Sequence, residues 1–332
     1  MTQKKDLLKI AGITFSISIA LSFAISFLLR MLKPSLGLDF TDFHVIMYTQ
    51  FITHFIAVFL PTMIALIYIR PKLQTLSIQF CGVRNLLLAI PIGLFSIPVI
   101  SYCNALFLII IKSIFGKLTF VGLPSPENIP QLILGILLVA VYPALSEELS
   151  YRGLILSGLK TRFSLRPAII FCGVLFAMNH FSLQVFFGIV LIGVLYSYIT
   201  WRTGSIIPAI LMHFINNSAS EITGYLSRDS NLPDTKSVIL TFSQIIDFAL
   251  GNPLLFVGYL VVILFILSFS IAVGVVCMHF LKPVRKPEPA LEETPEEPPA
   301  PADTKRFRMS WFIPGVVIII ILYGFEISKL IS

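Results

Sequence analysis

The sequence predicts an all-α protein: a polytopic transmembrane helical bundle of about eight to nine spans. Of the 332 residues, 56% are hydrophobic and only 12% are charged, against roughly 25% charged residues in soluble domains. Apolar runs of 18 or more residues recur along the chain, and about 20 helical residues cross a bilayer core of ~30 Å. The formal net charge of +7 falls mostly in the loops between these runs, so it indicates membrane orientation and not a nucleic-acid-binding surface.

Windows of about 19 residues place nine apolar segments along the chain. They lie near residues 10–29, 45–69, 86–111, 131–158, 168–180, 183–200, 205–220, 254–281 and 310–327. Two of these segments, 168–180 and 205–220, are short for a span, and the apolar stretch 239–250 has no clear assignment. These uncertain segments leave the count at eight to nine.

The basic residues between the spans predict a cytoplasmic N-terminus. Sixteen lysines and arginines fall in loops on the N-terminal side of the membrane, against seven on the other side. Loops rich in Lys and Arg stay in the cytoplasm. We therefore expect an integral, multi-pass protein of the plasma membrane whose first partner is the lipid bilayer.

The chain divides by composition into three parts. Residues 1–282 form the expected membrane-embedded bundle. Residues 283–304 are rich in proline and glutamate and predict an extended, solvated linker, because such a segment cannot bury a core. Residues 305–332 contain one more apolar helix. Because every motif described below precedes Lys282, this last span is expected to be an appendage that can be removed without loss of activity.

The fourth apolar segment contains three ionisable residues, Glu147, Glu148 and Arg152. Charged residues inside a membrane are costly, so each one requires a partner or a role. Glu148 and Arg152 are four residues apart and share one helix face, which predicts an ion pair. Glu147 points about 140° away from Arg152 and has no local partner. The alternative is that these charges sit at a helix end near the lipid headgroups.

Three further polar residues, His180, His213 and Asn217, lie in the segments that follow. His213 and Asn217 are four residues apart and therefore share one helix face. Measured along helices from the nearest cytoplasmic basic residue, Glu147 and these three residues all lie about 16 to 22 Å deep. A lone intramembrane histidine usually serves as an interhelical hydrogen-bonding residue, but four polar groups in one layer favour a functional site.

Two chemistries fit this layer. Glu147 with His180 could activate a water molecule, while His213 with Asn217 could supply hydrogen-bond donors for an oxyanion. Alternatively, Glu147, His180 and His213 could bind a divalent metal ion such as zinc. Asn217 favours the metal-independent reading, because asparagine is a poor zinc ligand but a good donor. The chain has no HExxH, GxSxG or Walker motif, which argues against those hydrolase and nucleotide-binding classes.

Three short motifs in this order resemble the CPBP intramembrane protease family, which includes the type II CAAX prenyl endopeptidases and bacterial immunity or bacteriocin-processing relatives. The motifs are SEELSYRG (146–153), FAMNH (176–180) and HFINN (213–217). The resemblance covers roughly residues 85 to 220 and does not extend to the linker or the last span.

The resemblance implies a peptide hydrolase, often classed as a metalloprotease, that acts on membrane-anchored or lipidated substrates, including prenylated CAAX-type peptides. It implies that Glu147 activates water with His180, and that His213 and Asn217 form the oxyanion site. Glu148 and Arg152 would then support these catalytic residues.

Two other classes of function remain open. A non-catalytic membrane scaffold or bacteriocin-immunity protein of the same fold would use the charged layer to bind a partner helix. A transporter would use the same buried charges as an ion relay. The absence of a visible internal repeat weakens the transporter reading.

Overall fold

The computed structural model of the protein describes residues 6–37, 39–119, 124–228, 239–284 and 308–332. Within these ranges all regular structure is helical and no strand is present. Seven helical segments are long and apolar enough to cross a membrane. The predicted all-α, multi-pass architecture is therefore confirmed, whereas the cytoplasmic location of the N-terminus stays a prediction. Most of the predicted linker, residues 285–304, lies outside the described residues.

The helices follow the nine predicted apolar segments. The first three segments correspond to α1 (Leu7–Leu36), to the continuous run of α2 (Phe43–His54), η1 (Phe55–Phe59) and α3 (Leu60–Ile69), and to α4 (Val83–Phe115). The fourth is α5 (Ile129–Gly135), η3 (Ile136–Val141), α6 (Tyr142–Glu148), η4 (Leu149–Ile155) and α7 (Leu156–Leu159). The remainder are α8 (Leu165–Met178), α9 (Leu183–Thr203), α10 (Ile207–Ser227), α13 (Pro253–His279) and α14 (Ile313–Ile331).

The unassigned stretch 239–250 contains a short helix, α12 (Phe242–Gly251). Its start is fixed by a capping box, in which the Thr241 side chain accepts from the Gln244 backbone and the Gln244 side chain accepts from the Thr241 backbone. Ten residues advance only about 15 Å. The helix is therefore too short to span a bilayer.

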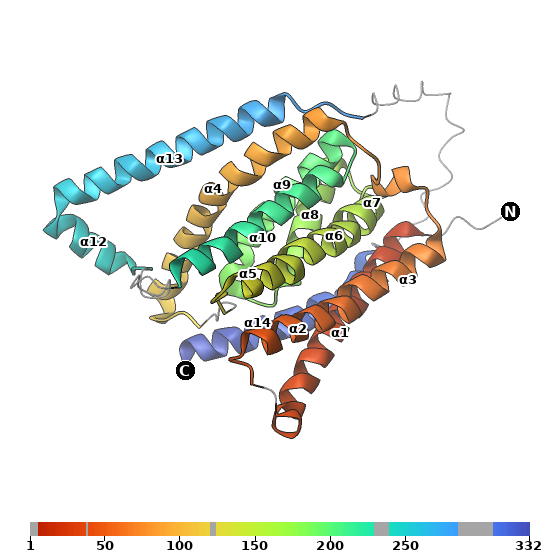
Figure 1. Ribbon diagram of the computed structural model, residues 1–332, viewed down its shortest axis with the longest axis horizontal. Coiled ribbons are helices and arrows are strands. Elements are labelled where there is room, and N and C mark those ends of the chain that lie inside the picture. The colour runs from red at the N-terminus through yellow and green to blue at the C-terminus, as the bar shows by residue number, and fades with distance from the viewer. Residues whose placement is uncertain (1–5, 38, 120–123, 229–238, 285–307) are drawn as a thin grey trace.

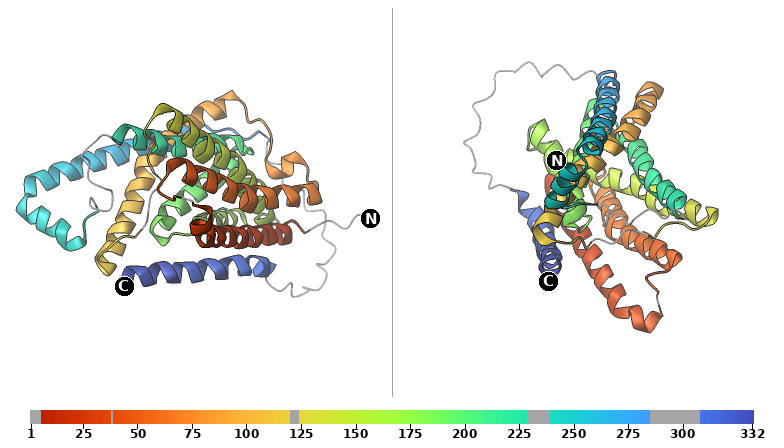
Figure 2. Two further views of the ribbon diagram at one scale, coloured as in Figure 1. Left: turned by 60° about the horizontal axis from the view of Figure 1, so that its bottom comes forward. Right: turned by 90° about the vertical axis from the view of Figure 1, so that its left-hand side faces the viewer.

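The fourth span and α8 to α10 form the centre of the bundle (Figure 1). On one side α4 packs against α9 and α10, and α13 lies outside α4. On the other side α1, α2, α3 and α14 pack together; the second set of views shows α14 running along α1 (Figure 2). The motif-bearing helices are thus enclosed between two outer groups of helices.

Glycines allow the central helices α8 and α9 to approach closely. A Cβ atom on Gly193 would lie only 2.7 Å from the Cα of Gly173. Small residues of this kind let membrane helices pack backbone against backbone. The crossing brings the carbonyl of Gly193 to 3.2 Å from the Arg152 guanidinium, so helix packing and the polar site are directly connected.

The last span, expected from the sequence to be an appendage, packs closely on α1. The rings of Phe15 and Phe312 lie 5.7 Å apart, and the Ser16 hydroxyl donates to the Trp311 carbonyl at 2.7 Å. That hydroxyl also accepts from the Gly315 backbone at 3.2 Å. A Cβ on Gly315 would lie 2.9 Å from the Phe15 ring, so the contact depends on the absence of a side chain there.

Candidate active site

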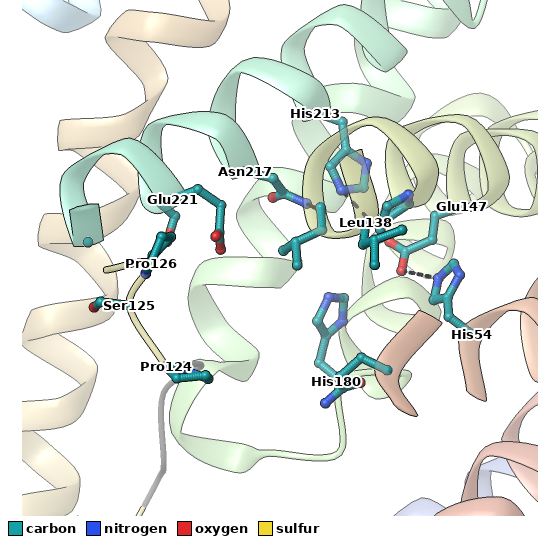
Figure 3. Close-up of a pocket in the computed structure, with 15 residues that line it drawn as sticks. His54, Pro124, Ser125, Pro126, Leu138, Glu147, His180, His213, Asn217 and Glu221 are labelled. Atoms are coloured by element: carbon teal, nitrogen blue, oxygen red, sulfur yellow. Dashed lines mark hydrogen bonds and ion pairs between the residues drawn. The ribbon is translucent and has the colours of Figure 1, made fainter. Parts of the chain in front are cut away.

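A cavity of about 500 Å³ lies inside the bundle, between the ends of α2 and α8, the fourth span and α10. Glu147, His180, His213 and Asn217 all line it (Figure 3). The structure therefore brings the four predicted catalytic side chains together in one cavity, as the common depth calculated from the sequence suggested.

The predicted pair of Glu148 and Arg152 is present and completely buried. Their side chains meet at 2.7 Å and both are 0% exposed. The guanidinium also lies 4.3 Å from the centre of the Phe176 ring and 5.4 Å from that of Tyr196. Cation–π contacts of this kind stabilise a desolvated guanidinium. Phe176 of the FAMNH motif thus holds Arg152 in place.

His213 extends this pair toward the cavity. Its Nδ1 lies 2.8 Å from Glu148 Oε1, the same oxygen that accepts from Arg152. A carboxylate paired with arginine only accepts hydrogen bonds, so Nδ1 carries the proton and donates. The other nitrogen, Nε2, faces Glu147 Oε2 at 3.8 Å. His213 can therefore donate from Nε2 only when the ring carries a second proton.

Sequence reasoning missed the partner of Glu147. His54, at the end of α2, places Nε2 at 2.7 Å from Glu147 Oε1, so one carboxylate oxygen is occupied while the other faces the cavity. The residue lies in the second apolar segment, where the rule that flagged His180 and His213 applies equally. That rule would have identified His54 as a candidate, although not its contact with Glu147.

His180 lies across the cavity from His213, just after the end of α8 (Figure 3). Its Nδ1 lies 3.1 Å from the Phe176 carbonyl. A carbonyl can only accept, so Nδ1 carries the proton and Nε2 is left with a free lone pair. Within the described residues, His180 and Glu147 share the cavity without a hydrogen bond to each other. Both side chains therefore line the space in which a small reactant would bind.

The turn that follows His180 is held by the last span. Phe181 adopts a left-handed backbone conformation, with φ of 53°, and α9 begins directly after Ser182. The Glu326 carboxylate on α14 accepts three hydrogen bonds here: from Ser182 Oγ (3.0 Å), the Leu183 backbone (2.5 Å) and Gln184 Nε2 (2.6 Å). Glu326 therefore caps α9 next to a cavity residue.

Asn217 also has a structural contact that the sequence did not predict. Its Nδ2 donates to the Val139 carbonyl at 2.9 Å. Pro143, four residues later, has no N–H to donate to that carbonyl in the α-helical pattern. One of the two Nδ2 hydrogens is thereby used to join α10 to the fourth span, and the other is available to a ligand.

The proposed metal set of Glu147, His180 and His213 does not form a ligand geometry. Within the described residues, no three His, Cys, Asp or Glu side chains are grouped as an ion would require. Glu147 Oε1 is engaged by His54, and His180 Nδ1 by the Phe176 carbonyl. As placed, the three side chains are not grouped as a zinc site requires.

Comparison with known proteins supports the motif analysis. Residues 129–219 match the family model described as Rce1-like, type II CAAX prenyl endopeptidase Rce1-like. The match extends from α5 into α10 and contains all three motifs, so the recognition made from the motifs is confirmed for this part of the chain. His54 and Glu326 lie outside it. Comparisons with curated proteins and with solved structures find no match.

Proposed function

We propose that the protein is an intramembrane endopeptidase that hydrolyses peptide bonds of membrane-associated substrates, including prenylated CAAX-type peptides. The observation that carries the proposal is that Glu147 Oε2 and His180, with its free Nε2, line one cavity inside an apolar bundle. The matched family segment points to the same activity.

In this mechanism a water molecule sits between Glu147 and His180. It donates to the carboxylate and to Nε2 of the imidazole, and its oxygen attacks the carbonyl carbon of the substrate as Glu147 takes a proton. Glu147 then returns that proton to the departing amine. His54 holds the other carboxylate oxygen at 2.7 Å, which keeps the reactive oxygen directed at the cavity.

His213 and Asn217 supply the donors for the oxyanion. Because Nδ1 of His213 is committed to Glu148, donation from Nε2 requires the cationic form of the ring. The remaining Nδ2 hydrogen of Asn217 is the second donor. Donors fixed in advance in a region of low dielectric stabilise the transition state more than the substrate.

Cleavage by the purified protein in lipid nanodiscs tests the proposal, with matched prenylated and unprenylated membrane peptides as substrates. Glu147→Gln keeps the shape of the side chain but removes the base, so we expect cleavage to fall by roughly 10²- to 10⁴-fold. Glu127→Gln, at an exposed glutamate, is the matched control and should cleave normally. Normal cleavage by Glu147→Gln would remove Glu147 from the mechanism. If the folded protein cleaves neither peptide, a non-catalytic scaffold is the better reading.

Metal removal separates this mechanism from the zinc alternative. With Glu147 acting as a plain base, cleavage should continue after dialysis against a chelator. Complete loss that stoichiometric zinc restores, together with one bound metal per chain in elemental analysis, would establish the zinc mechanism instead.

A further inference from the structure

The end of the cavity away from His54 contains a buried carboxylate without a partner. Glu221 is 5% exposed, and its Oε2 has no hydrogen-bond partner within the described residues. The side chain projects from α10 into the cavity, between Asn217 and the segment of Ser125 and Pro126 (Figure 3). Oε2 itself is packed against Gly135, and the Glu221 side chain lines the cavity from this position.

The other two buried glutamates each have a basic partner, whereas Glu221 has none among the described residues. Glu147 is bonded to His54, and Glu148 is bonded through Oε1 to both Arg152 and His213, although Glu148 Oε2 is also without a partner. A carboxylate removed from water without a partner is unfavourable unless something else supplies the hydrogen bonds or the opposite charge. At Glu221, a bound ligand could therefore supply the hydrogen bonds or the positive charge that the protein does not.

The local backbone makes room for this side chain. Glu221 lies against Gly135 of α5, and a Cβ atom at position 135 would overlap Oε2. Any other residue at 135 would therefore displace the carboxylate from its place between α5 and α10. The absence of a side chain at Gly135 keeps Glu221 at the cavity wall.

The position of Glu221 along α10 gives its distance from the chemistry. It follows His213 by eight residues on one continuous helix, which corresponds to about 12 Å. An extended peptide advances about 3.3 Å per residue. A substrate strand lying along α10 with its scissile carbonyl at His213 would therefore place a side chain at Glu221 about three to four residues away.

We propose that Glu221 forms a specificity subsite for a basic side chain, lysine or arginine, located three to four residues from the scissile bond. The inference rests on the proposed protease function. A cationic group suits this position because it neutralises the buried charge and also donates hydrogen bonds to it. The hydroxyl groups of Ser125 and Ser220, which line the same cavity, can accept the remaining ammonium or guanidinium hydrogens.

The test uses one membrane peptide in a series that moves a single lysine from two to six residues away, on each side of the scissile bond. Each lysine peptide has a matched glutamine peptide, and kcat/KM is measured for both in nanodiscs. We expect about a tenfold preference for lysine at the third or fourth position. The preference should fall to about one in Glu221→Gln and reverse toward a glutamate peptide in Glu221→Lys. Glu127→Gln should keep the full lysine preference.

A second measurement keeps this test independent of catalysis. Peptide affinity is measured by fluorescence anisotropy with Glu147→Gln, alone and combined with Glu221→Gln. Tighter binding of the lysine peptide, lost in the double variant, supports the subsite even if no peptide is cleaved and the protease proposal fails. Equal binding of lysine and glutamine peptides, or a Glu221→Gln variant that weakens both equally, overturns the subsite. Thermal unfolding of each variant identifies any loss that comes from misfolding.

Discussion

Helices α13 and α14 are both candidate membrane spans, but they have very different surroundings. Both are apolar enough to span a membrane and both lie outside the matched segment 129–219. In α13 only Ser270 is buried, and large side chains such as Phe265 are 69% exposed. In α14, by contrast, Gly315 and Ile319 pack against the bundle. Hydropathy therefore identifies a span without showing how closely that span packs against the rest of the bundle.

The difference extends to the site. α13 packs along α4, on the outside of the bundle (Figure 1). α14 reaches the start of α9, where Glu326 holds the turn next to His180. Of these two spans, α14 is the one with described hydrogen bonds to the turn next to His180, and variants can test whether that contact matters.

Removal of α14 should have the largest effect. Truncation after Val284 removes the contacts with α1 and the cap of α9, so we expect peptide cleavage to fall at least tenfold, contrary to the expectation from sequence that this span is dispensable. The measurement is cleavage in nanodiscs, and co-expression of residues 305–332 as a separate chain should restore part of it. A truncated protein with full activity would show that the sequence expectation was right.

Substitution of one glycine in each helix tests how closely α13 and α14 pack, without replacing any polar side chain. Gly315→Leu must displace the Phe15 ring, whereas a Cβ on Gly274 of α13 meets nothing within 4 Å. Overpacking typically costs about 1 to 3 kcal/mol, and an open surface site changes stability by no more than about 0.5 kcal/mol. Thermal unfolding in one detergent should therefore show a clear decrease in Tm for Gly315→Leu and almost none for Gly274→Leu. Equal shifts would contradict the difference between the two helices.

Replacement of Glu326 should lower stability less than Gly315→Leu does, and it should have a specific effect on activity. Loss of a cap of this kind costs about 1 kcal/mol, but the affected turn adjoins His180. Glu326→Ala should therefore lower kcat more than it raises KM, and Glu326→Gln, which keeps an acceptor oxygen, should recover part of the rate. A fall in stability with unchanged kcat would assign Glu326 a purely structural role.

Most of the correct predictions from the sequence came from local patterns, namely apolar windows and residue spacing along a helix. The apolar windows located all nine segments, and the four-residue spacing identified the pair of Glu148 and Arg152. The contact of His54 with Glu147 joins residues 93 positions apart, and no periodicity states which helices will meet. Glu326 carried a usable signal, because an acidic residue within an apolar span requires a partner. Its partners lie in a turn whose position only the tertiary fold determines.

The fourth span contains π-helical segments on both sides of α6, the turn that holds Glu147 and Glu148. A π-helix has about one residue more per turn than an α-helix, as though a residue had been inserted. Deleting a single residue from η3 or η4 would shorten the span by only about 1.5 Å. The same deletion would rotate one half of the helix by about 100° relative to the other and separate the acidic pair from Arg152 or from α10. A scan of single-residue deletions in this span should therefore show that activity depends on the rotational register of the helix and not on its length.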